Sequence, residues 1–71
     1  MYHVTIRDSR KIIGQALRDG LAEAVEWGVV NSLKGNHISV YEAMQDATGD
    51  ILHLSKAVSL VKLDGKLKVV T

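Results

Sequence analysis

The stretch "KGNHISVYEAMQDATGDILHLSKAVSLVKLDGKLKVV", which runs from Lys34 to Val70, decides the fold of this chain. It can form a three-stranded meander, or two helices followed by a short hairpin. In the meander, "HISVYEA" and "ILHLSKAVSL" are strands whose apolar and polar residues alternate, as in a half-buried sheet. In the helical arrangement, apolar residues recur with a period of about 3.6, which is typical of an amphipathic helix. The two arrangements predict different functions.

A helix is favoured for the first half of this stretch. Ser39 is followed three residues later by Glu42, which is the spacing of a capping box. Apolar side chains then recur at helical spacing, at Val40, Ala43, Met44 and Ala47. Gly49 stands where helices commonly close with a left-handed residue. The pattern therefore predicts a helix over residues 39–48 that starts at the Ser39 cap.

A helix is also favoured for "ILHLSKAVSLVKL", because a hairpin at its end would pair unsuitable residues. If the Asp-Gly pair that follows it closed a two-residue hairpin, Leu63 would face Lys66 and Val61 would face Lys68. Apolar and charged residues would then share a face on both strands. A helix that ends near Leu63, turns, and enters a strand "KLKVV" avoids this conflict.

The N-terminal half predicts one strand and two helical segments. "YHVTI" alternates as a short half-buried strand. A helix capped by Asp8 or Ser9 is expected next, with a stop or kink at Gly20. In the second helix, apolar residues recur every four positions, at Leu21, Val25, Val29 and Leu33.

Residues 29–70 together resemble a winged helix-turn-helix domain. The parts that carry the resemblance are a helix ending in "NSLKGN", a second helix "SVYEAMQDA", the turn "TGD", a third helix "ILHLSKAVSLVKL" and a wing that starts at "DGKLKVV". The expected fold class is therefore α+β and mainly helical, with a short N-terminal strand pairing with the C-terminal wing strand. The alternative is a β-α-β-β meander with one helix.

The resemblance implies a small DNA-binding protein that regulates transcription, with its third helix in the major groove and its wing on phosphate. The polar residues of the third helix would contact bases and phosphates: His53, Ser55, Lys56, Ser59 and Lys62. Lys66 and Lys68 of the wing strand would contact phosphate without reading sequence.

Two other functions are also compatible with the sequence. The same scaffold could serve as a protein-binding inhibitor or adaptor, since a fold does not determine a function. In the meander, an oligomeric β-α-β-β protein could bind a small ligand at its subunit interfaces. The chain lacks nucleophile-elbow, phosphate-loop and dinucleotide motifs, so we expect no enzymatic activity and no cofactor. His3, His37 and His53 lack the spacing of a metal site, so we expect no metal.

Composition predicts one small domain spanning residues 1–71. The chain has no cysteine, so a reducing cytoplasm is the expected compartment. It also has no apolar run near the roughly 20 residues that span a bilayer, so no membrane partner is expected. The net charge is +1, divided into +3 over residues 1–18, −5 over 19–50 and +3 over 51–71. Such asymmetry is compatible with a nucleic-acid surface or with contacts between copies.

The small size of the chain also predicts a homodimer. A domain this small without disulfides has little net stability and gains from burying a second apolar surface. Four apolar residues would be hard to cover in one core and are the expected interface: Trp27, Val30, Leu52 and Leu60.

Overall fold

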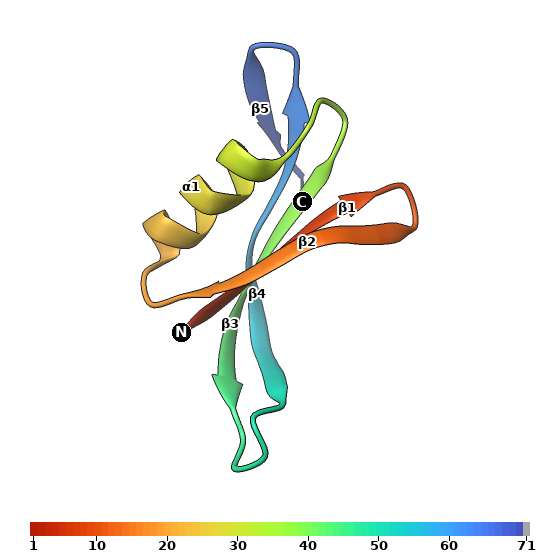
Figure 1. Cartoon of the computed structure of the whole chain (residues 1–71). Helices are drawn as coiled ribbons and strands as arrows, with labels where there is room; N and C mark the ends of the chain where they lie inside the picture. Colours follow the sequence, from red (N-terminus) through yellow and green to blue (C-terminus); the bar gives the residue numbers. More distant parts are fainter. Residues whose placement is uncertain (71) are drawn as a thin grey trace.

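The protein is a curled five-stranded antiparallel sheet with one helix on one face, and its computed structural model describes residues 1–70 (Figure 1). The elements follow in the order β1 (Tyr2–Asp8), β2 (Lys11–Arg18), α1 (Leu21–Asn31), β3 (His37–Gln45), β4 (Ile51–Leu63) and β5 (Lys66–Val69). The strand order in the sheet is β2-β1-β3-β4-β5, and each neighbouring pair is antiparallel. The domain is elongated, with extents of 40 × 23 × 21 Å.

The predicted winged helix-turn-helix and its mainly helical fold class are wrong, because most of the described chain is strand. The residues expected to form the second and third helices lie in β3 and β4, and the segment expected to form the first helix contains β2. The N-terminal strand pairs with β2 and β3, not with the C-terminal strand. The alternative β-α-β-β meander is nearer to the structure, although it has three strands and the sheet has five. The strand at "YHVTI" and the helix that begins at Leu21 are confirmed.

Burial explains why β3 is a strand despite its capping box. Ile38 and Val40 lie opposite Ile6 and Val4 of β1, and all four side chains are completely or almost completely buried. Burying a side chain of this kind contributes about 1.5–3 kcal/mol, whereas a helix cap contributes about 1 kcal/mol. Ser39 therefore lies in a strand and does not cap a helix.

The β4–β5 hairpin has the register that the sequence pattern disfavoured. Leu63 lies opposite Lys66 and Val61 lies opposite Lys68, across a two-residue turn in which Gly65 has a φ of +71°. β5 is a short edge strand whose four residues are all exposed. Because a lysine can lay its aliphatic stem on apolar neighbours while its ammonium stays in water, the mixed face is tolerated there.

The core lies between α1 and the centre of the sheet. The helix packs against β1, β2 and β3, and the buried Ala24 and Gly28 face the sheet. A Cβ on Gly28 would lie 2.6 Å from Ile38 Cγ2 and 3.1 Å from Val4 Cγ2. The glycine therefore allows α1 to approach the sheet more closely than any other residue would.

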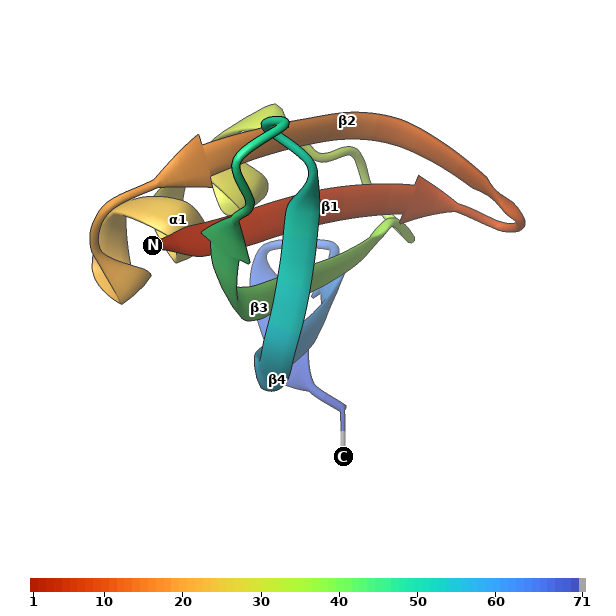
Figure 2. The ribbon, with the colours of Figure 1, turned by 90° about the horizontal axis from the view of Figure 1, so that it is seen from below.

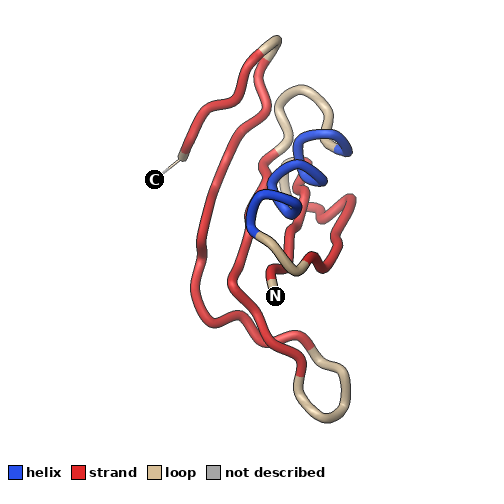
Figure 3. The backbone as a smooth tube through the Cα atoms, turned by 90° about the vertical axis from the view of Figure 1, so that its left-hand side faces the viewer, coloured by secondary structure: helices blue, strands red, loops and turns tan. Residues whose placement is uncertain are grey.

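The long β3–β4 hairpin extends past the helix. Figure 2 shows this hairpin crossing in front of β1 and β2, with α1 behind them. In Figure 3, β4 is the long bowed strand that runs along most of the molecule. The pairing register shifts twice along the hairpin, between Val40 and Tyr41 and between Glu42 and Ala43. Such bulges increase local twist and bend, which explains how the end of the hairpin reaches the face opposite α1.

Replacing Gly28 with alanine should destabilise the protein. The added methyl improves helix propensity by about 1 kcal/mol, but overpacking a core typically costs 1–3 kcal/mol, and here the clash is with a buried side chain. We expect a net loss of about 1 kcal/mol in the free energy of unfolding, measured by urea denaturation. Gly14→Ala is the control, because its Cβ would make ordinary contacts, 3.5 Å from Trp27 and 3.6 Å from Ile6. Equal stability of the two variants would contradict the close-approach argument.

Candidate functional site

The outer edge of β4 is open along most of its length. β3 pairs with β4 from Ile51 to Val61, but β5 pairs only with residues 60–63. One further bond, from Val70 N–H to the Ser59 carbonyl at 2.8 Å, extends that pairing. Within residues 1–70, the outer edge of 51–58 therefore has no strand beside it. An unpaired edge presents a row of N–H and C=O groups that another strand can bind.

The side chains of this edge are mostly apolar, and one of them is charged. Leu52 is 46% exposed and Leu54 is 59% exposed, and Met44 of the neighbouring strand is 46% exposed. Lys56 is the one charged residue between positions 51 and 58. Natural edge strands are usually protected by several charges, by proline, by bulges or by covering loops, and of these β4 has two bulges and a single lysine. An exposed apolar edge of this length is a candidate protein-binding surface.

A polar cluster lies on the sheet face opposite α1, where the hairpin folds back. His3 Nδ1 lies 2.8 Å from His53 Nε2, and His3 Nε2 lies 2.8 Å from Gln15 Oε1. Because an amide oxygen only accepts, His3 donates from Nε2 and accepts at Nδ1 from the N–H of His53. His3 is 7% exposed, and both of its ring nitrogens are occupied. The bonds join the β1–β2 hairpin to β4, which is distant from it in sequence.

Aromatic stacking orients the exposed ring of this cluster. Tyr41 stacks on His53 with ring centroids 4.0 Å apart and an angle of 3° between the planes. The Lys56 ammonium lies 5.7 Å from the Tyr41 ring. The stack holds the imidazole plane of His53 so that its Nε2 points at His3. Sequence reasoning placed His53 and Lys56 on a helix and missed Gln15 and Tyr41, since only the strand registers bring these residues together.

The predicted DNA-contact residues have no recognition helix to carry them. His53, Ser55, Lys56, Ser59 and Lys62 all lie on β4, and Lys66 and Lys68 lie on β5. Lys62 has an internal role, because its Nζ donates to the carbonyls of Val29 and Ser32 at 2.8 and 2.9 Å. A cation there satisfies the free carbonyls at the C-terminal end of α1 and interacts favourably with its dipole. The winged-helix arrangement predicted for these residues is therefore wrong, and their contact with DNA stays a prediction.

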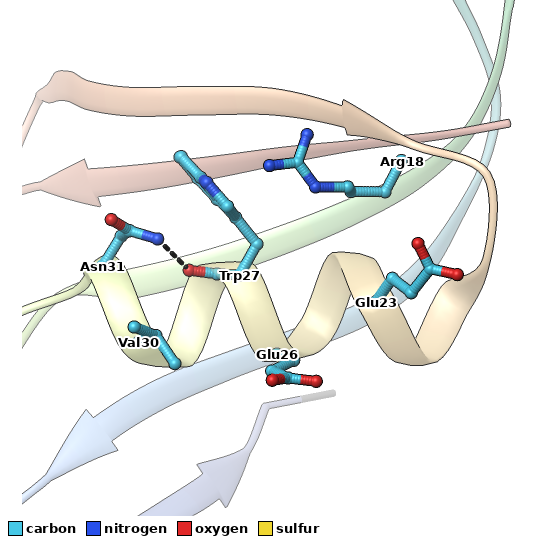
Figure 4. Close-up of a pocket in the computed structure, with 6 residues that line it drawn as sticks. All are labelled: Arg18, Glu23, Glu26, Trp27, Val30 and Asn31. Atoms are coloured by element: carbon cyan, nitrogen blue, oxygen red, sulfur yellow. Dashed lines mark hydrogen bonds between the residues drawn. The ribbon is translucent and has the colours of Figure 1, made fainter.

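The four predicted interface residues are dispersed. Trp27 is half-buried against the core, and the Arg18 guanidinium lies 5.9 Å from its ring. Figure 4 shows Trp27 and Arg18 on one flank of α1 and Val30 on another, and Val30 is 71% exposed. Leu60 is 6% exposed and belongs to the core, whereas Leu52 lies on the open β4 edge. Val30 and Leu52 are thus the two that are available to a partner.

The tip of the β3–β4 hairpin is ordered by one carboxylate. Asp46 Oδ1 accepts hydrogen bonds from Thr48 N at 2.9 Å, Thr48 Oγ1 at 2.7 Å and Asp50 N at 3.0 Å. The side-chain bond from Thr48, together with the backbone N–H groups, lowers the pKa of Asp46 below its ordinary value of 3.8. Gly49 adopts a φ of +89°, which suits this tight turn. The tip determines where β4 begins.

Comparisons with known proteins give no further guidance. No family model, no curated protein and no solved structure matches this chain. Among the described residues, no group of three or more His, Cys, Asp or Glu side chains is placed to hold a metal ion. α1, the one helix in residues 1–70, is too short to cross a membrane.

The hairpin tip should loosen in acid at a pH set by Asp46. Because the folded pKa is lowered, the stabilisation is present above about 3.8 and is lost as pH falls through the lower folded value. The amide chemical shifts of Thr48 and Asp50, followed by NMR, should titrate with a midpoint below 3.8. In Thr48→Val the midpoint should rise toward 3.8. A wild-type midpoint at or above 3.8 would refute this account of the tip.

Proposed function

We propose that this protein is a small protein-interaction module that works as a homodimer, in which the open edge of β4 pairs with the same edge of a second copy. The observation that carries this proposal is the unpaired outer edge of residues 51–58 with its exposed leucines. Antiparallel pairing about a two-fold axis would join the two sheets into one ten-stranded sheet. Each backbone group on the edge would then gain a partner.

The balance of buried and exposed apolar residues supports association. The core holds seven buried apolar residues, of which two are alanines, while eleven large apolar side chains are exposed in the described chain. A core of this size leaves a 71-residue domain with little net stability. Covering part of the exposed apolar surface in a second copy would supply what the single core lacks.

The β4 edge is suited to pairing with itself. Antiparallel pairing centred on Ser55 places Leu52 opposite Val58 of the second copy, which matches two apolar residues. Lys56 would lie opposite Leu54 of the second copy and away from the other Lys56. Like charges therefore do not meet across the axis, and each lysine stem can pack on a leucine.

A charge placed on the edge should dissociate the dimer. We expect the wild-type chain to sediment as a dimer at micromolar concentration and Leu54→Lys as a monomer with unchanged circular dichroism. Val30→Lys is the matched control, because Val30 is equally apolar and exposed but lies on α1. It should remain dimeric. A monomeric wild type refutes the proposal, and loss of the dimer only in Val30→Lys would assign the interface to the helix.

A cysteine scan should locate the two-fold axis. The chain has no cysteine, so a cysteine introduced at any one position from 52 to 58 is the only thiol that can form a disulfide. A disulfide forms when the Cα atoms lie about 4.4–6.8 Å apart, which holds only for positions at the axis of the paired edge. We expect efficient cross-linking at Ser55→Cys or an adjacent position and none at the Leu33→Cys control. Uniformly poor cross-linking across the scan would contradict edge pairing.

A further inference from the structure

The two facing imidazoles of His3 and His53 form a site of their own. Their Nδ1 and Nε2 atoms lie 2.8 Å apart and point at each other. We propose that this pair binds one divalent transition-metal ion of the zinc type, with both imidazoles as ligands. Neutral imidazole nitrogen is a preferred ligand of zinc. This site does not depend on the pairing of the β4 edge.

The surroundings of the pair match those of metal-binding histidines. In such sites the second ring nitrogen commonly donates to an oxygen acceptor, which sets the tautomer and orients the ring. His3 Nε2 donates in this way to Gln15 Oε1 at 2.8 Å, so its Nδ1 presents a lone pair to the other ring. The parallel stack with Tyr41, at 4.0 Å, fixes the plane of His53. The tautomer of His3 and the ring plane of His53 are therefore set before any ion arrives.

A separation and a turn of the two rings would convert the hydrogen bond into a coordination site. With zinc–nitrogen bonds of about 2.0 Å in a tetrahedral arrangement, two ligand nitrogens lie about 3.3 Å apart, so the rings must separate by roughly half an ångström and each must turn by about 35°. The ion takes the place of the hydrogen between the rings, and His53 then carries its own hydrogen on Nδ1. No oxidation or net proton release is involved. Because His53 is exposed, water can complete the coordination.

The hairpin gives the site a structural consequence. His3 lies on β1 and His53 on the far half of β4, fifty positions apart in the chain. An ion held by both would tie the end of the β3–β4 hairpin to the sheet face opposite α1. Binding an ion to the folded chain alone stabilises it, so zinc should also raise the unfolding temperature.

Calorimetric titration of zinc chloride into the protein tests the proposal. The chain should carry a short extension without histidine before Met1, so that a terminal amine cannot join His3 as a ligand. We expect saturable binding of one ion per chain, abolished in His53→Ala. Gln15→Leu should weaken binding at least about tenfold, since losing the partner of a ligating histidine typically costs 10–100-fold. His37→Ala is the matched control, because His37 is exposed on β3 outside the cluster, and it should bind as the wild type does.

Histidine ring ¹⁵N spectra of the wild type give a readout that does not rely on any variant folding. On adding zinc, the Nδ1 resonance of His3 and the Nε2 resonance of His53 should shift, and those of His37 should not. Absence of saturable binding overturns the proposal. Unchanged binding in His53→Ala, or loss of binding in His37→Ala, overturns it as well.

Discussion

The close approach of α1 to the sheet at Gly28 is the constraint on which the rest of the structure depends. With no side chain at this position, the helix backbone lies directly over Ile38 and Val4. Those residues belong to β3 and β1, so the contact stabilises the pairing of two strands that are far apart in sequence. Lys62 of β4 attaches the C-terminal end of α1 to the sheet, because its ammonium donates hydrogen bonds to the last carbonyls of the helix. The helix, β1, β3 and β4 thus form one interdependent unit.

The position of α1 also determines which part of the sheet stays uncovered. The helix packs on β1, β2 and β3, and a helix of eleven residues cannot reach the far half of β4 as well. β5 is only four residues long, so it leaves most of the outer edge of β4 unpaired. An exposed apolar edge would be a liability in an isolated monomer, which is the physical reason to expect a second copy there.

β4 serves two roles because a strand has two faces and two edges. Its outer edge presents backbone groups and leucines, while His53 turns toward β1 and meets His3. The bulges in the β3–β4 hairpin make this possible, since they bend the strand enough to fold over the open face. Asp46 orders the hairpin at its tip, and the imidazole pair ties it to β1 a few residues beyond the tip.

Local patterns in the sequence determined the elements that depend on neighbours along the chain. The alternation of "YHVTI" predicted β1, and the four-residue spacing from Leu21 predicted α1. Tertiary structure alone decided β2, β3 and β4. In β3, a capping box worth about 1 kcal/mol competed with burial of two aliphatic side chains against β1, and the larger contribution was non-local. The polar cluster follows the same rule: His3, Gln15 and His53 carry no common motif, because His53 of β4 reaches the β1–β2 hairpin only in the folded sheet.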